Sequence, residues 1–150
     1  MKPKLLISAC LCGKNTKYNG GNNLIEQLKE LEEQFELVLI CPEVMGGLAT
    51  PRVPSEIVGE KVLSKEGRDV TEAFQRGAIE SLKIAKTHNI TLALLKEASP
   101  SCGVHKIYDG TFCGHKVDGT GMTTRILMDN NIKVFCENEI VEILELAKTI

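Results

Sequence analysis

Three of the six cysteines, Cys10, Cys41 and Cys102, each lie shortly after an apolar run, although they are far apart along the chain. Cysteine thiolates prefer soft metals and iron–sulfur clusters. A structural zinc site normally uses four ligands, often as C-x2-C pairs, and this sequence has no such pair. A cluster held by three cysteines leaves one iron open to a substrate. The three residues therefore indicate an iron–sulfur centre, provided that the fold brings them together.

Cysteine also has a purely structural interpretation, because a buried cysteine packs like a small hydrophobic residue. That alternative is open for any one of the three, but it explains their shared position less well. The remaining cysteines, Cys12, Cys113 and Cys136, are expected to be packing residues.

Groups suited to proton transfer flank these cysteines. Glu43 follows the second cysteine of the set by two residues, and Ser99 and Ser101 precede the third. Carboxylates and hydroxyls at such positions can move protons to and from a bound molecule. Glu43 could instead be a solvated loop carboxylate, and Arg52 is expected to be a surface residue. Glu43, Ser99 and Ser101 are the candidate catalytic residues.

Short apolar runs bounded by turn residues predict buried strands. These runs are residues 4–9, 36–40, 91–95 and 133–135. In a parallel sheet, ligands bind beyond the carboxyl ends of the strands, where loops from different strands meet. The three candidate ligands follow three of these runs, so the sheet should deliver them to one edge.

Apolar residues at helical spacing predict a helix in each gap between the strands and another after the last strand. The first helix is expected to be capped by Asn23 and the second by Asp69. The third should run from about Gly121 to Asp129, and the last should be capped by Asn138. This alternation predicts an α/β fold, a parallel sheet with helices on both faces.

Two connections are too long to be simple loops. Residues 42–68 carry several glycines and prolines and are expected to form an active-site loop or a small hairpin. Residues 104–118 are expected to form a hairpin that turns at Asp109-Gly110. The edge of the sheet that carries the active site should therefore be rich in loops and hairpins.

Size and composition limit the class of protein. At 150 residues the chain has the usual size of one domain, so residues 1–150 are expected to form a single domain. A net charge of -2 without long runs of one sign gives no indication of a nucleic-acid polymer as partner. The apolar part of the N-terminal segment is shorter than the roughly 7 to 15 residues of an export signal, so we expect a cytoplasmic protein with no membrane partner. In that reducing compartment the cysteines should not form disulfides.

Several short motifs occur in a fixed order along the chain. They are Ser8-Ala9-Cys10-Leu11 with Gly13 and Tyr18-Asn19-Gly20, Cys41-Pro42-Glu43-Val44-Met45-Gly46-Gly47-Leu48, Thr50-Pro51-Arg52 with Pro54 and Glu56-Ile57, and Ser99-Pro100-Ser101-Cys102-Gly103. Together they resemble the thiouracil desulfurase-like family, long catalogued only as a domain of unknown function. The similarity extends over roughly residues 5 to 136.

The resemblance implies a single Rossmann-like domain that holds an oxygen-sensitive 4Fe-4S cluster on Cys10, Cys41 and Cys102. It implies an enzyme that acts on a small thiolated pyrimidine, either a nucleobase or a nucleotide. The open iron would accept the thiocarbonyl sulfur, and water would replace that sulfur on carbon without net redox change. Such an open iron is a Lewis acid, which polarises the carbon–sulfur bond.

The same resemblance assigns roles to the flanking groups. Glu43 would shuttle protons and activate water, and Ser99 or Ser101 would position or protonate the substrate. The chain departs from the family pattern at Cys12 and at Met122-Thr123-Thr124, which bears on the shape of the pocket and not on the cluster ligands.

Two other classes of function fit the same residues. The cysteines could hold a cluster or a persulfide for delivery to a partner, which would make the protein a non-catalytic carrier. Alternatively, the chain could be a small nucleotide-binding module with structural cysteines. Iron content after anoxic preparation, followed by a turnover assay, separates these classes.

Overall fold

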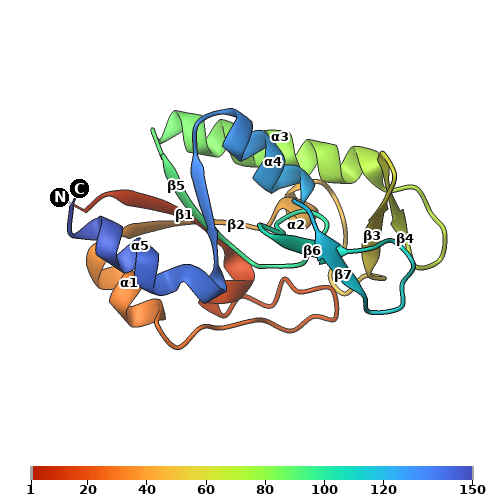
Figure 1. Ribbon diagram of the computed structural model, residues 1–150, viewed down its shortest axis with the longest axis horizontal. Coiled ribbons are helices and arrows are strands. Elements are labelled where there is room, and N and C mark those ends of the chain that lie inside the picture. The colour runs from red at the N-terminus through yellow and green to blue at the C-terminus, as the bar shows by residue number, and fades with distance from the viewer. Residues whose placement is uncertain (1, 150) are drawn as a thin grey trace.

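Four parallel strands form the central sheet of the computed structural model, which describes residues 2–149. They are β1 (Lys4–Ser8), β2 (Glu36–Ile40), β5 (Leu92–Leu95) and β8 (Lys133–Cys136). Their order is β2-β1-β5-β8 (Figure 1). Every neighbouring pair is parallel, with Leu6 of β1 opposite Val38 on one side and Ala93 on the other. The predicted α/β sheet is confirmed.

Helices cover both faces of this sheet. Figure 1 shows α3 (Thr71–Thr87) and α4 (Met122–Asp129) on one side, and α1 (Leu28–Gln34) and α5 (Ile140–Ala147) on the other. Successive residues of a strand point to opposite faces of the sheet. A sheet with a core on each face therefore needs apolar residues at both odd and even positions of its strands. Leu6 packs in the core beneath α3 and α4, whereas its neighbours Leu5 and Ile7 pack in the core beneath α1 and α5.

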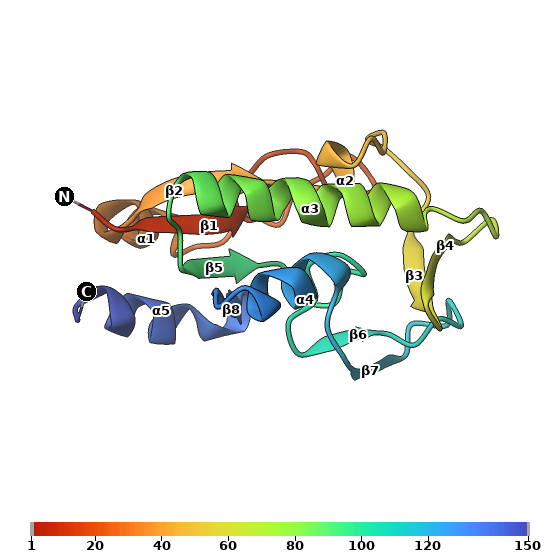
Figure 2. The ribbon, with the colours of Figure 1, turned by 90° about the horizontal axis from the view of Figure 1, so that it is seen from above.

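The two long connections build a separate edge of the molecule. The first contains α2 (Pro42–Met45) and a hairpin of β3 (Ser55–Val58) and β4 (Lys61–Ser64). The second contains a hairpin of β6 (Lys106–Tyr108) and β7 (Lys116–Asp118). Figure 2 shows these elements beyond the carboxyl ends of the parallel strands, at the end of the molecule opposite to both termini. The second hairpin was predicted, the first was one of two alternatives for its segment, and α2 was not predicted.

A carboxylate joins the two hairpins. Glu56 in β3 is buried, and its Oε1 accepts hydrogen bonds from the backbone N–H groups of Gly110 at 2.9 Å and Phe112 at 3.1 Å. These residues lie in the connection between β6 and β7, which spans residues 109–115 and is longer than the tight Asp109-Gly110 turn that we predicted. The hairpins are therefore held against each other by a contact that no local pattern encodes.

Three of the predicted helix starts need correction or comment. Asn23 does not cap the first helix, because α1 begins at Leu28. Asn138 does not cap the last, because a 3-10 turn at Glu137–Glu139 precedes α5 and Cys136 is its N-cap residue, in a capping box with Glu139. Asp69 is not the N-cap residue of α3, which is Val70, but its carboxylate accepts the N–H of Thr71, the first residue of the helix, at 2.9 Å. All six cysteines are free.

No helix within residues 2–149 combines the length and the apolar character that a membrane crossing requires.

Candidate functional site

The carboxyl ends of the strands open into a cavity of about 420 Å³. Its wall takes residues from the end of β1, from α2 and the segment after it, from the loop after β5, and from both hairpins. All three candidate ligands, Cys10, Cys41 and Cys102, line this cavity, and so do Glu43 and Ser99. The convergence expected at this edge is therefore present in the structure.

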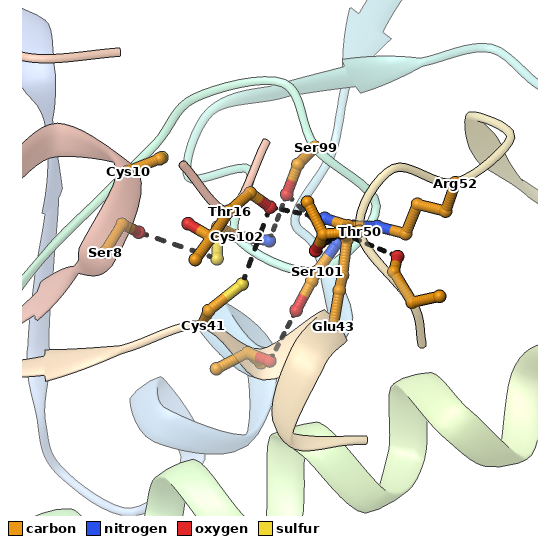
Figure 3. Close-up of polar contacts among 12 residues, drawn as sticks. Ser8, Cys10, Thr16, Cys41, Glu43, Thr50, Arg52, Ser99, Ser101 and Cys102 are labelled. Carbon is orange, nitrogen blue, oxygen red and sulfur yellow. Dashed lines mark hydrogen bonds and ion pairs between the residues drawn. The ribbon is translucent and has the colours of Figure 1, made fainter. Parts of the chain in front are cut away.

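Each of the three thiols is held by a different element. Cys10 lies in a 3-10 turn, η1 (Ala9–Cys12), directly after β1, and its Sγ is 3.5 Å from the donor Nδ2 of Asn23. Cys41 is the N-cap residue of α2, and its Sγ is 3.9 Å from the carbonyl oxygen of Thr16. Cys102 follows β5 in the loop of residues 96–105 (Figure 3).

Cys102 is the most enclosed of the three. Its Sγ lies 3.7 Å from the donor Oγ of Ser8, and that hydroxyl in turn accepts the N–H of Lys96 at 3.0 Å. Burial raises the pKa of the Cys102 thiol to about 12, despite the hydrogen bond from Ser8, and the nearby Glu43 raises it further. Burial likewise raises the pKa of Cys10, and the neighbouring Cys41 adds to the effect. The raised pKa values of Cys10 and Cys102 favour the protonated thiols, which suits a site that loses its protons on metal binding.

The three sulfurs do not all lie close enough together to bind one ion as they stand. Thiolates around one zinc, each at about 2.3 Å, lie roughly 3.8 Å apart. The three sulfurs are not among the groups of ligand atoms, in residues 2–149, that approach within 4.8 Å of one another. In a cluster each thiolate binds a different iron, which requires a wider separation. The donor set therefore fits an iron–sulfur cluster better than one metal ion.

Glu43 and Arg52 form an ion pair in the wall of the cavity. Arg52 donates from Nε to Oε2 of Glu43 at 3.0 Å, and its Nη2 contacts the same oxygen. The side chains are only 11% and 16% exposed for Arg52 and Glu43, respectively. Among the described residues nothing donates to Oε1 of Glu43, so that oxygen keeps its capacity to accept a proton. Our expectation of a surface arginine was wrong.

The same guanidinium joins three segments around the site (Figure 3). Its Nη2 donates to the carbonyl of Thr16 at 2.9 Å, and its Nη1 donates to Oγ1 of Thr50 at 3.0 Å and to the carbonyl of Ala49 at 3.3 Å. Arginine suits this role because its planar fork presents several donors in a fixed geometry. Arg52 therefore holds the orientation of the Glu43 carboxylate relative to the loop that contains Thr16.

The two candidate serines are placed differently. Ser99 lines the cavity, and its Oγ accepts the N–H of Cys102 at 2.6 Å and that of Ser101 at 3.2 Å. Ser101 is 1% exposed, bonds to Oγ1 of Thr123 at 2.8 Å, and is not among the residues that line the cavity. The structure therefore brings Ser99 together with Glu43 and the three cysteines, and it places Ser101 in the layer behind them.

The loop that carries Ser99 and Cys102 is organised by Glu97. Its Oε1 accepts the backbone N–H groups of Val104 at 2.6 Å, His105 at 3.0 Å, and Ala98 and Lys106 at 3.1 Å. Burial acts to raise the pKa of this carboxyl, but the backbone donors outweigh it and the pKa is lowered. The ionised Glu97 carboxylate thus binds backbone N–H groups from both ends of the loop through one oxygen.

Several residues at the site were not found by sequence reasoning. Ser8 and Asn23 donate to the sulfurs, and Asn23 was interpreted only as a helix cap. No sequence feature indicated that Glu97 belongs to the site. Cys12 lies in the same 3-10 turn as Cys10 and not in a strand, and it borders a separate shallow depression with Leu28, Glu32 and Phe35. Of the cysteines expected to pack, Cys113 is exposed.

The segment that carries Cys41 and Glu43 is positioned by an unusually close contact between α2 and α3. A Cβ on Gly77 would lie 1.9 Å from the carbonyl oxygen of Pro42, and a Cβ on Gly46 would lie 1.9 Å from that of Ala73. Glycine within a helix costs roughly 1 kcal/mol relative to alanine. At Gly77 that cost is offset by the approach of the two backbones.

Replacing Gly77 with alanine is expected to destabilise the protein by about 1–3 kcal/mol, because the added methyl overlaps backbone and α2 must move. The melting temperature should fall by several degrees, at roughly 2–4 °C per kcal/mol for a chain of this size. Gln75→Ala, on an exposed position of the same helix, is the matched control and should change the melting temperature little. Equal melting temperatures for Gly77→Ala and wild type would show that the contact is not tight.

Comparison with known proteins agrees with this geometry. The family model described as 2-thiouracil desulfurase matches residues 5–139. The uncharacterized protein YbbK of Bacillus subtilis (strain 168) is 40% identical over 150 residues, which covers 93% of this chain and 99% of the relative. A solved structure of the 4Fe-4S-dependent thiouracil desulfidase TudS is 43% identical, with a TM-score of 0.92 and 99% of both chains covered. The resemblance inferred from the motifs is confirmed.

Proposed function

Because the chain belongs to the 2-thiouracil desulfurase family, we propose that it is a 4Fe-4S-dependent enzyme that removes sulfur from a thiouracil-like pyrimidine. Cys10, Cys41 and Cys102 hold the cluster, since their sulfurs border one cavity at the ends of three separate segments. The convergence of these thiols with Glu43 is the observation that carries the proposal.

The cluster supplies an iron with an open coordination position, a Lewis acid suited to a thiocarbonyl sulfur. In the overall reaction, the C=S group and water give C=O and hydrogen sulfide, so no external electron donor is needed. The chain must therefore bind the pyrimidine, admit one water and move the protons of that water.

Glu43 is the group proposed to move those protons. Oε2 is engaged by Arg52, and Oε1 is left to accept a proton from the attacking water and to return it to the leaving sulfur. Arg52 thus holds the carboxylate in place through Oε2, while Oε1 stays available for proton transfer. Arg52 acts as a positioning residue, because its contacts are to Glu43 and to the protein chain.

Ser99 is proposed to position the substrate. Its oxygen already accepts two backbone N–H groups, so its own proton is free to be donated to a polar atom of the pyrimidine. Ser101 lacks this opportunity, since its hydroxyl is paired with Thr123.

The two serines give a paired prediction. Ser99→Ala should lower kcat/KM by about 10²-fold, which is within the range for loss of a positioned proton donor, and should retain its iron. Ser101→Ala should leave the kcat/KM of the folded enzyme nearly unchanged and should lower stability by about 1 kcal/mol, because Thr123 loses its partner. Steady-state kinetics and thermal unfolding of both variants check this, and the reverse order of kinetic effects would exchange the roles.

The proposal itself is tested by anoxic reconstitution followed by turnover. We expect a brown protein with about four irons and four sulfides per chain, the composition of a 4Fe-4S cluster. With 2-thiouracil it should release sulfide without added reductant. A colourless, iron-free product would contradict the cluster, and a loaded protein that releases no sulfide from thiouracil or a thiouridine nucleotide would instead support the carrier alternative.

A further inference from the structure

A second group of metal-ligating side chains lies at the end of β8, outside the set of cysteines described above. One ligand atom each from Glu97, His105 and Cys136 lies within 4.8 Å of the other two. Glu139 adjoins this group, because its Oε1 is 2.8 Å from Nε2 of His105 and accepts the N–H of Cys136 at 2.9 Å. Sulfur, nitrogen and carboxylate oxygen donors thus meet at one point, from three segments of the chain.

The donor atoms already take part in hydrogen bonds within the protein, but Oε2 of Glu97 has capacity left to bind an ion. Of the Glu97 oxygens, Oε1 accepts four backbone N–H groups, whereas Oε2 accepts only that of His105, at 3.1 Å. Cys136 is 2% exposed, while the side chain of His105 is 56% exposed. The site therefore has a buried soft donor at its base and an open side through which an ion can enter.

The charges around these donors favour a cation. Lys96 is paired with Glu137 at 2.8 Å, so it does not neutralise Glu97 or Glu139. The hydrogen bond to Glu139 raises the pKa of His105, and burial raises the pKa of Cys136 to about 12. Two carboxylates therefore face the imidazole of His105 and the thiol of Cys136, and an ion that binds the thiolate displaces the thiol proton to solvent.

We propose that Glu97, His105, Cys136 and Glu139 form a second metal site, for a single zinc ion. Zinc takes tetrahedral sets of thiolate, imidazole and carboxylate ligands at about 2.0–2.3 Å, which lie roughly 3.3–3.8 Å from one another. The ligand atoms of Glu97, His105 and Cys136 lie within 4.8 Å of one another, so side-chain movement must bring them to that spacing, and Glu139 joins them through its contact with Nε2 of His105. The mixed donor set is unlike the three-thiol set of the cavity, so the two sites select different metals.

The position of the site in the fold suggests what the ion does. Glu97 and His105 stand at the two ends of the loop that carries Ser99 and Cys102, and Cys136 ends a strand of the central sheet. A zinc ion bound to all three ties both ends of this loop to β8. It therefore stabilises the loop, and it does so whether or not the cavity holds a cluster.

The test is zinc binding by the cluster-loaded protein, measured by equilibrium dialysis against zinc sulfate with elemental analysis. We expect one zinc per chain in addition to the iron, and a rise in melting temperature on zinc addition. Cys136→Ser and His105→Gln should each weaken zinc binding at least ~10-fold. Serine is a favourable N-cap residue, so Cys136→Ser keeps the turn that starts at this position. Cys113→Ser, at an exposed cysteine, is the control and should bind zinc as wild type does.

Cobalt provides an independent readout, because a cobalt–thiolate bond gives a charge-transfer absorption band. The full-length variant Cys10→Ala/Cys41→Ala/Cys102→Ala, which lacks the cavity thiols, should show this band with one cobalt per chain, and adding Cys136→Ser should abolish it. The proposal is overturned if loaded wild type binds no zinc, or if Cys136→Ser binds zinc as tightly as wild type. Neither outcome affects the iron content or the desulfuration assay. Failure of the zinc proposal can therefore be told apart from failure of the proposed function.

Discussion

Cys102→Ala is expected to abolish binding of the cluster and, with it, all sulfide release from thiouracil. Cys102 is the innermost of the three thiols, and Ser8 and the loop after β5 hold its sulfur in the wall of the cavity. Alanine leaves two thiols, and no other cysteine lines the cavity within the part of the chain that the structure describes. After anoxic reconstitution the variant should be nearly colourless, with almost no protein-bound iron.

The fold should survive this change, because alanine keeps the backbone hydrogen bonds of Cys102 to Ser99 and Thr124. Removing one sulfur atom from a packed site costs about 1 kcal/mol. Circular dichroism and the melting temperature of the apo variant should therefore remain close to wild type. Loss of iron in an unfolded variant would say nothing about ligation, which is why this measurement accompanies the iron assay.

Cys12→Ala is the matched control for cysteine replacement. Cys12 shares the 3-10 turn of Cys10 but borders the depression next to α1 and not the cavity. The variant should keep its full iron content and its activity. If Cys12→Ala lost the cluster and Cys102→Ala kept it, the proposed set of ligands would be incorrect.

Glu43→Gln is expected to keep the cluster and to lower kcat by about 10²–10⁴-fold, the usual contribution of a positioned general acid–base group. Glutamine has the same shape and can still accept a hydrogen bond from Arg52, but it cannot take up and return a proton. Iron content, the visible spectrum and KM for thiouracil should therefore change little compared with kcat. A brown variant that turns over at the wild-type rate would remove Glu43 from the mechanism.

Arg52→Lys separates the positioning of the carboxylate from its chemistry. Lysine keeps the positive charge but loses the planar fork that reaches Glu43, Thr16 and Thr50 together. We expect a fall in kcat of about 10-fold, smaller than that of Glu43→Gln, since the carboxylate is still present but less well oriented. A larger loss for Arg52→Lys than for Glu43→Gln would indicate that Arg52 itself contacts the substrate.

The predicted metal ligands illustrate how far local patterns reach. Cys10, Cys41 and Cys102 were identified because each follows a strand, and strands are marked by apolar runs and turn residues within a few positions. Parallel pairing then places the carboxyl ends of β1, β2 and β5 at the same edge. This parallel topology follows from the alternation of strands and helices along the chain. That alternation can be predicted from local sequence patterns.

Side-chain partners at the site could not be obtained in this way. Asn23 had an acceptable local role as a helix cap, yet it donates to Cys10 because the chain after η1 folds back over the sulfur. Arg52 had no local feature that distinguished it from a solvated arginine, and its pairing with Glu43 depends on the path of the segment after α2. Ser99 and Ser101 flank the same proline in the sequence but have opposite environments in space.

The parallel sheet, the alternation of its strands and helices along the chain, and the three cysteines at its edge could thus be predicted from the sequence. Strand and helix periodicity are set by residues close together in the chain. Three relations are visible only in the folded protein. They are the free oxygen of Glu43, the serine that faces the cavity, and the position of Cys136 beside His105 and Glu97. These relations depend on the packing of segments that are distant in sequence. Small displacements of such segments change the hydrogen-bond partners without any change in the local pattern.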